Sequence, residues 1–232
     1  MGRQMDYQEI YAKHADAYDE LVAAEDCDGN LLPALERLIP VAGRRVVEVG
    51  AGTGRVTRLL ARAGATVMAT ERSPAMLAVA QQRLGVQTNV SWYVASADAL
   101  PVETGWADAG VAGWVFGHFR EWMPSGWEAE LERALAELSR VVRPGGVVVI
   151  IETLGTGSTE PAPPTPGLAE YYDWLEARGF MRSSVRTDFR FDSVDEAARV
   201  TGFFFGSAFG ERVRQEGWSR IPECTGLWSR TL

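Results

Sequence analysis

At residues 48–54 the chain reads Glu48-Val49-Gly50-Ala51-Gly52-Thr53-Gly54. A short β-branched run, 45–49, leads into this segment, and apolar residues over 56–63 recur afterwards with the period of a helix face. The three glycines allow the backbone to turn sharply and to approach a ligand closely. The N-terminus of the helix that follows favours an anionic group. The segment therefore predicts a strand, a ligand-binding loop and a helix.

The spacing of the glycines separates this loop from two other nucleotide-binding loops. The dinucleotide pattern G-x-G-x-x-G requires glycine at position 55, where the chain has Arg55. No Gly-Lys-Ser/Thr follows the strand, so the phosphate-binding P-loop pattern is also absent. An NAD(P)-dependent oxidoreductase is therefore the weaker alternative.

Alternating strands and helices follow the loop. Apolar runs predict further strands at 65–70, 90–95, 109–115 and 146–152, and helical periodicity predicts helices at 75–84 and 127–142. This alternation predicts a doubly wound α/β sheet that binds ligands beyond the carboxyl ends of its strands.

The segments at the two ends of the chain have a different character. Amphipathic spacing predicts one helix over 7–24 and another over 30–38. Beyond the sheet come a proline-rich stretch (155–167), a helix (168–178), an alternating run (184–191), a helix opened by Asp192-Ser193 and a final strand-like run (221–232). Alternation is typical of exposed antiparallel edge strands.

The length of 232 residues suits one domain with appendages. We expect residues 1–40 to form a helical cap over the active site and residues 41–232 to form the main domain. Within that domain, residues 155–180 are expected to form a proline-rich loop and a lid helix.

Five segments, in order, resemble the motifs of class I S-adenosylmethionine-dependent methyltransferases, in particular their small-molecule, UbiE-like group. They are the acid-x-Gly-x-Gly-x-Gly loop, TERSPAML at 70–77, ADALP at 97–101, ADAGV at 107–111 with the chain up to His118, and RVVRPGG at 140–146. The resemblance covers about residues 40–155. It implies a Rossmann-like, three-layer α/β/α fold with a seven-stranded, mostly parallel sheet and an antiparallel C-terminal edge hairpin. It also implies S-adenosylmethionine as cofactor and S-adenosylhomocysteine as product.

Glu71 has a physical interpretation besides the resemblance. It follows the loop by about twenty residues, a distance at which an acid can accept hydrogen bonds from both ribose hydroxyls. The resemblance implies that Asp98 binds the adenine amino group, that Ala99 offers a backbone N–H and that Met76 packs on the ring. Glu48 would brace the loop near the methionine ammonium. The full set of expected cofactor-binding residues is Glu48, Gly50, Ala51, Gly52, Thr53, Gly54, Glu71, Arg72, Met76, Asp98, Ala99, Gly113 and Trp114.

Methyl transfer from a sulfonium is an in-line displacement of an already activated group, so alignment alone can supply an effective molarity of about 10⁵ M or more. A general base increases the rate by a further factor of about 10²–10⁴ where the acceptor must lose a proton. The resemblance implies that His118 faces the methyl group, and we take it as the candidate catalytic residue. The alternative is a hydrogen-bonded packing histidine.

Aromatic residues concentrate around the fourth predicted strand and on the first helix. They predict a small, apolar or aromatic methyl acceptor, and transfer to oxygen, nitrogen, sulfur or carbon is equally consistent with them. The expected acceptor-binding residues are Tyr11, Tyr18, Trp114, Phe116 and Trp122.

Charge and composition indicate which other classes of partner we do not expect the protein to bind. The net charge of −8 and the lack of an Asn/Asp-Pro-Pro-Tyr motif argue against nucleic acid. No apolar run approaches the ~20 residues that cross a bilayer, and Cys27 and Cys224 have no metal-like spacing. We expect a cytoplasmic monomer or homodimer that binds neither metal nor membrane. A noncatalytic cofactor-binding scaffold stays open, because binding does not prove turnover.

Overall fold

The structure is a computed structural model, and it describes residues 7–123 and 125–232. The first six residues of the expected cap, 1–40, lie outside the described residues. Within these ranges, no helix combines the length and the apolar character that a membrane crossing requires.

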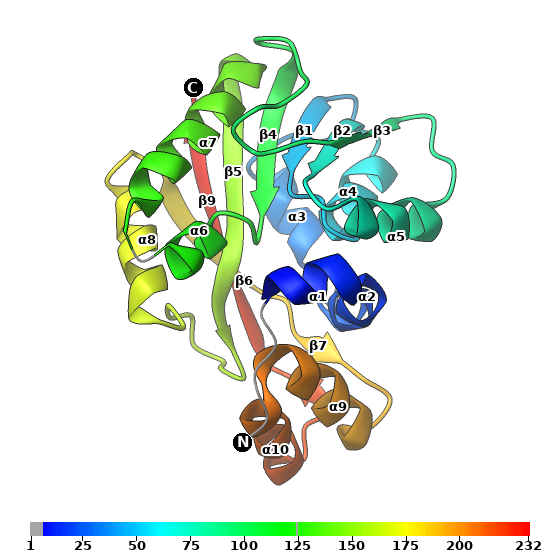
Figure 1. The fold of residues 1–232 in the computed structure, drawn as a ribbon. Coiled ribbons are helices and arrows are strands. Elements are labelled where there is room, and N and C mark those ends of the chain that lie inside the picture. Colours follow the sequence, from blue (N-terminus) through cyan, green and yellow to red (C-terminus); the bar gives the residue numbers. More distant parts are fainter. Residues whose placement is uncertain (1–6, 124) are drawn as a thin grey trace.

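A seven-stranded sheet forms the centre of the molecule, in the order β3-β2-β1-β4-β5-β9-β6 (Figure 1). β1 to β5 pair in parallel, whereas β9 is antiparallel to both β5 and β6. The predicted mostly parallel sheet with an antiparallel C-terminal edge is confirmed. The strands are β1 (Arg45–Val49), β2 (Thr66–Glu71), β3 (Val90–Val94), β4 (Ala107–Gly113), β5 (Val142–Thr156), β6 (Met181–Arg186) and β9 (Glu223–Thr231).

The strand order reverses at β1, which pairs with β2 on one side and with β4 on the other. Val49, the last residue of β1, lies opposite Thr70 of β2 and Ala112 of β4. Chain segments leave the sheet in opposite directions at such a switch point, so a crevice opens at the carboxyl ends of the strands. The loop 50–54 starts at this crevice.

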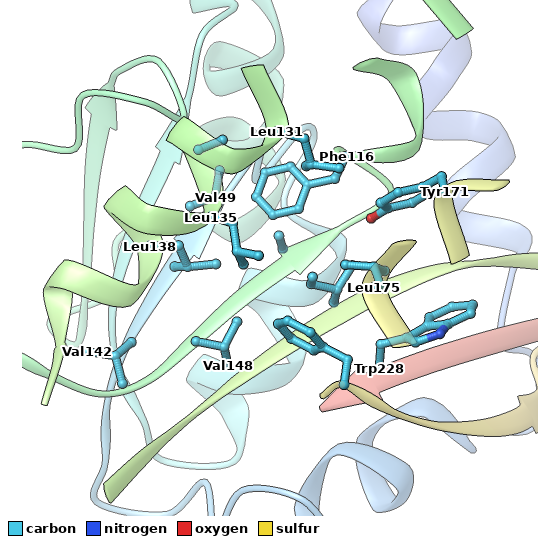
Figure 2. Close-up of a cluster of buried hydrophobic side chains, with 14 of the residues drawn as sticks. Val49, Phe116, Leu131, Leu135, Leu138, Val142, Val148, Tyr171, Leu175 and Trp228 are labelled. Atoms are coloured by element: carbon cyan, nitrogen blue, oxygen red, sulfur yellow. The ribbon is translucent and has the colours of Figure 1, made fainter. Parts of the chain in front are cut away.

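Helices cover both faces of the sheet, and the alternation of side chains along each strand sends neighbours to opposite faces. Val47 of β1 belongs to the core cluster beneath α7 and α8, part of which Figure 2 shows, whereas Val46 belongs to the cluster beneath α3 and α4. The two clusters confirm the three-layer α/β/α architecture. The helices around the sheet are α3 (Leu31–Glu36), α4 (Arg55–Arg62), α5 (Pro74–Leu84), α6 (Gly117–Trp122), α7 (Trp127–Val141) and α8 (Pro166–Glu176).

The single helix predicted over 7–24 is wrong, because the chain breaks at His14. α1 (Tyr7–Lys13) and α2 (Ala15–Ala24) flank this residue, whose backbone is non-helical at φ −131° and ψ 36°. The His14 ring packs edge-on against Phe203, with 5.7 Å between ring centroids. The break allows two short helices, rather than one long one, to follow the edge of the crevice.

The run 184–191 is also not one strand. β6 ends at Arg186, and β7 (Phe189–Arg190) pairs with β8 (Arg220–Ile221) in a separate two-stranded sheet. The Asp188 carboxylate holds this corner: Oδ1 accepts from the Arg186 guanidinium at 2.7 Å and Oδ2 accepts from Arg220 Nε at 2.9 Å. These ion pairs stabilise a turn at a position where the alternating sequence pattern alone predicts a continuous strand.

A small helical layer packs beside α1 and α2 (Figure 1). It consists of α9 (Val194–Phe205), which Ser193 caps as the sequence predicts, and α10 (Ser207–Glu216). Its apolar side chains form a separate cluster with Leu21 of α2 and with β7 and β8. The main sheet and this layer therefore enclose α2 between them.

Candidate functional site

Two adjoining cavities lie at the carboxyl end of the sheet. The larger has a volume of about 750 Å³ and the smaller about 300 Å³. The larger lies beyond β1, β2 and β4, whereas the smaller is enclosed by α2, the end of β5, the start of α8 and the helical layer of α9 and α10. Four ring-bearing side chains line both: Tyr11, Tyr18, Trp114 and His118.

The glycine loop forms one wall of the larger cavity. Gly50 has φ +69°, and a Cβ there would lie 2.2 Å from Val115 Cγ2. Gly52 has φ +56°, and a Cβ there would point toward Met76, 3.6 Å from its Cε atom. Both positions therefore need glycine: at position 50 a side chain would clash with Val115, and at position 52 it would narrow the cavity.

Glu71 connects the tip of β2 to this loop. Its Oε2 accepts from the Gly52 N–H at 3.1 Å, and its Oε1 accepts from the Ser73 N–H at 2.9 Å. The Ser73 hydroxyl in turn accepts from the Met76 N–H at 3.4 Å and so caps α5. One carboxylate therefore anchors the loop and also faces the cavity.

Most of the residues expected to bind a cofactor line the larger cavity. They are Gly50, Gly52, Glu71, Arg72, Met76, Asp98, Gly113 and Trp114. Val49, Ser73, Ser96 and Val115 line it as well and were missed, because nothing but their position beside the motifs distinguishes them. The Asp98 carboxylate accepts a hydrogen bond from the Ser96 hydroxyl.

Four further expected residues do not line the larger cavity. The Ala51 N–H donates to Thr70 O at 2.9 Å, and Thr53 is buried. Gly54 caps α4 with φ +87°. The Ala99 N–H donates to Ser96 O at 3.1 Å, so the expectation that it is offered to a ligand is not met.

Glu48 is buried and lines neither cavity. Its Oε2 accepts from Thr57 Oγ1 of α4 at 2.6 Å, so it braces the loop from behind. Burial raises the pKa of Glu48 to about 7, although the hydrogen bond from Thr57 opposes the shift.

We expect Glu48→Gln to stabilise the protein at alkaline pH. The pKa of Glu48 is raised on folding, so its contribution to stability is complete below about pH 4.5 and is lost as the pH rises through about 7. Glutamine keeps the acceptor for Thr57 and cannot ionise. The free energy of unfolding of the variant should exceed that of the wild type by about 1–3 kcal/mol at pH 8, and by less at pH 5. Denaturant titrations at both pH values measure the difference, and parallel pH dependences would contradict the assignment.

His118 lies at the junction of the cavities. Its Nε2 is 3.0 Å from the Tyr11 hydroxyl, and its ring stacks on Trp122 with centroids 4.7 Å apart and an interplanar angle of 7°. Burial lowers the pKa of His118 to about 4. The imidazole is therefore neutral at pH 7, and it is a weak base.

Of the five expected acceptor-binding residues, four line a cavity, whereas Phe116 does not. Phe116 is fully buried in the core between the sheet and α7 (Figure 2), because the chain turns into α6 at this residue. Trp122 Nε1 is buried beside the larger cavity and has no hydrogen-bond partner among the described residues. The Trp122 Nε1–H group could therefore donate a hydrogen bond to a bound molecule.

Trp114 separates the two cavities and is held in an unusual backbone conformation, with φ +53°. The Arg55 guanidinium covers its ring, 3.3 Å from the centroid, and pairs with Glu25. Arg55, which breaks the dinucleotide pattern in the sequence, therefore positions the wall between the cavities.

Four glutamates line the smaller cavity: Glu25, Glu121, Glu152 and Glu223. The sequence reasoning missed all four. Glu152 had a usable signal, because it is a charged residue at the end of a continuous apolar strand. Its Oε1 accepts from the Gly117 N–H at 2.9 Å and from the Tyr171 hydroxyl at 3.3 Å.

The segment 155–180 lies at the smaller cavity. Pro164, Thr165 and Leu168 line that cavity, whereas Tyr171 and Tyr172 of α8 are buried in the core. In the described part of the chain, no three His, Cys, Asp or Glu side chains are grouped so that they could hold a metal ion.

Comparison with known proteins agrees with this geometry. Residues 47–150 match the model of the methyltransferase domain family. This segment, which is a little less than half of the chain, thus resembles a methyltransferase domain. The matched segment contains the glycine loop, Glu71, Asp98 and His118, whereas the cap, the helical layer and β6 and β9 lie outside it.

Similar individual proteins extend the comparison. A demethylmenaquinone methyltransferase from Clavibacter sepedonicus is 33% identical over 156 residues, which cover 63% of the chain and 58% of the relative. The match thus spans less than two thirds of that relative's length. A SAM-dependent methyltransferase from Aquifex aeolicus superposes with a TM-score of 0.54 at 16% identity, covering 98% of this chain and 94% of that one. The [4+2]-cyclase SpnF superposes with a TM-score of 0.55 at 20% identity, covering 87% and 80%.

Proposed function

We propose that the protein is an S-adenosylmethionine-dependent methyltransferase that acts on a small molecule. One observation carries the proposal: the larger cavity lies at the switch point of the sheet, and Gly52, Glu71 and Asp98 line it. Ligands of doubly wound folds bind at this position. The family match of residues 47–150 supports the same conclusion.

The residues of the larger cavity fit the parts of this cofactor. Glu71 can accept hydrogen bonds from ribose hydroxyls, since each carboxylate oxygen that binds a backbone N–H keeps a second lone pair. Asp98 can accept from an adenine amino group, while buried Met76 offers an apolar surface to the ring. A Cβ at position 52 would narrow this space. The bound cofactor would supply a methyl group already activated on a sulfonium.

The chain's own part in the reaction is to exclude water and align the acceptor. Tyr11, Trp114 and His118 line both cavities, so an acceptor in the smaller one would reach the larger at these side chains. His118 is neutral at pH 7 and can position an acceptor through a hydrogen bond, which we propose as its role in place of strong general base. The cap formed by α1 and α2 would close the junction.

Two other functions predict different ligands. An NAD(P)-dependent oxidoreductase is disfavoured, because Arg55 occupies the third glycine position and stacks on Trp114. A noncatalytic scaffold or an enzyme of another class would share the fold, as the superposition with a cyclase illustrates.

Calorimetric titration tests the proposal. We expect S-adenosylhomocysteine to bind with a dissociation constant in the micromolar range or below and NAD(P) to show no heat of binding. Transfer of label from S-adenosylmethionine to a panel of amines, phenols, thiols and carboxylic acids then separates enzyme from scaffold. Binding of NAD(P) without binding of S-adenosylhomocysteine would overturn the proposal.

A further inference from the structure

The smaller cavity combines an aromatic wall with buried acids. Tyr11, Tyr18 and Trp114 line it toward the larger cavity, and four phenylalanines line it toward the helical layer: Phe189, Phe204, Phe205 and Phe209. The volume of about 300 Å³ is at the lower end for cavities that hold a small organic ligand. Its position beside the candidate cofactor cavity makes it the place for an acceptor.

The acidic side chains that line this cavity outnumber the basic ones. Of its described lining residues, Arg55 is the sole arginine or lysine, and it pairs with Glu25. His118 is neutral, so no cation that lines the cavity forms an ion pair with Glu121, Glu152 or Glu223, although the charge of Arg55 lowers the pKa of Glu223. Burying carboxyl groups without a cation or full hydrogen bonding is costly, and a ligand that supplied a positive charge would relieve this cost.

Glu223 also lacks a hydrogen-bond donor at one of its carboxyl oxygens. The residue is 2% exposed, and its Oε1 accepts from Thr153 Oγ1 at 2.7 Å. Its Oε2 is buried and has no hydrogen-bond partner within bonding distance among the described residues, although the nearby Thr156 hydroxyl lowers the pKa of the carboxyl group. Buried side-chain polar atoms are normally satisfied, so an unsatisfied carboxylate oxygen at the edge of a cavity indicates a missing donor.

Glu152 completes the acidic side of the cavity. It is 4% exposed, and both of the hydrogen bonds described above fall on its Oε1 atom. The donors to Glu152 are the backbone amides of Gly117 and Phe116 and the Tyr171 hydroxyl, and none of them is a cation. No grouping of three acids suits a metal in the described part of the chain, so an organic cation is the better ligand.

We infer that the smaller cavity binds the methyl acceptor and that this acceptor carries an amine on an apolar or aromatic body, with the amine held by Glu152 and Glu223. The inference rests on the proposed function and adds the substrate class. Ammonium groups donate up to three hydrogen bonds, which suits two carboxylates, and they also bind the faces of aromatic rings.

Binding of such an amine should release protons at neutral pH. Burial raises the pKa of both Glu152 and Glu223 to about 8, so both are largely protonated in the empty cavity at pH 7. The neighbours that act on these two pKa values include Glu25, Arg55 and Thr153 around Glu223, and Glu121, Tyr171 and the Gly117 N–H around Glu152. An ammonium beside a carboxyl favours its ionised form. Each amine bound should therefore release about one proton.

The test compares three probes of the same shape: 4-phenylbutylamine, 4-phenylbutan-1-ol and 4-phenylbutyrate. Each is titrated at pH 7 into protein saturated with S-adenosylhomocysteine, in phosphate and in Tris, whose different ionisation enthalpies report proton release. We expect the amine to bind about tenfold more tightly than the alcohol, with proton release, and the carboxylate to bind most weakly. Equal binding of amine and alcohol, or tightest binding of the carboxylate at Arg55, would overturn the inference.

Variants of the two glutamates test whether they are the groups that bind the amine. Glu152→Gln and Glu223→Gln should each weaken amine binding by about tenfold and leave alcohol binding within about twofold, while the exposed Glu216→Gln serves as the control. Unchanged amine affinity in both cavity variants would overturn the inference. The S-adenosylhomocysteine titration is scored separately. Protein that binds S-adenosylhomocysteine but not the amine contradicts the inference alone. If S-adenosylhomocysteine does not bind, the amine is titrated into the protein without it, and amine binding there contradicts the proposed function but not the amine selectivity of the smaller cavity.

Discussion

Glu71→Gln is expected to weaken binding of S-adenosylhomocysteine by about 10- to 100-fold. The wild-type carboxylate accepts a backbone N–H on each oxygen, from Gly52 and from Ser73. A glutamine side chain has only one acceptor oxygen, so its NH₂ group would face one of these N–H donors. The variant therefore loses a charge-assisted hydrogen bond, disturbs the loop and loses an acceptor for the ribose.

Calorimetry on the folded variant measures this effect, with circular dichroism as the check on folding. Glu216→Gln, on the exposed end of α10, makes the same chemical change away from both cavities and should bind like the wild type. Wild-type affinity in Glu71→Gln would show that the larger cavity is not the cofactor site.

Gly50→Ala should reduce the free energy of unfolding by about 2–5 kcal/mol. A left-handed backbone costs a residue with a Cβ about 1–2 kcal/mol. At this position the Cβ would also lie 2.2 Å from Val115 Cγ2, and overpacking of this kind adds about 1–3 kcal/mol. Since Val115 itself lines the larger cavity, its displacement should also lower affinity for S-adenosylhomocysteine.

Gly29→Ala provides the matched control. Gly29 has φ +70°, close to the +69° of Gly50, but a Cβ there would meet nothing within 4 Å. Gly29→Ala should therefore lower the free energy of unfolding by only the backbone contribution of about 1–2 kcal/mol, and it should leave ligand binding unchanged. Denaturant titrations of both variants give the difference. Equal destabilisation would mean that Val115 moves aside without cost.

Glu25, Glu152 and Glu223 illustrate how a site can be absent from local sequence signals. They come from the end of α2, from β5 and from β9, and they line one cavity because β9 inserts between β5 and β6. Burial then raises the pKa of each of these carboxyl groups. The insertion does not follow from residues near each glutamate in the chain, and of the three only Glu152, at the end of an apolar run, carries a local signal of burial.

Sequence patterns alone are enough to predict the order of strands and helices around 48–54 and the candidate cofactor residues at the carboxyl ends of the first strands. These depend on short-range patterns: glycines that permit a turn, apolar periodicity, and a Ser-Pro helix start. Of the residues chosen in this way, Gly50, Gly52, Glu71, Met76 and Asp98 line one cavity.

Whether each remaining residue faces the core or a cavity depends on how distant segments of the chain pack together. Phe116 and Trp122 both lie in the segment after β4, yet one is in the core and the other borders the larger cavity. The break at His14, the corner held by Asp188 and the acidic second cavity arise from contacts between segments distant in sequence. Burial and long-range pairing set these features, and no local periodicity encodes them.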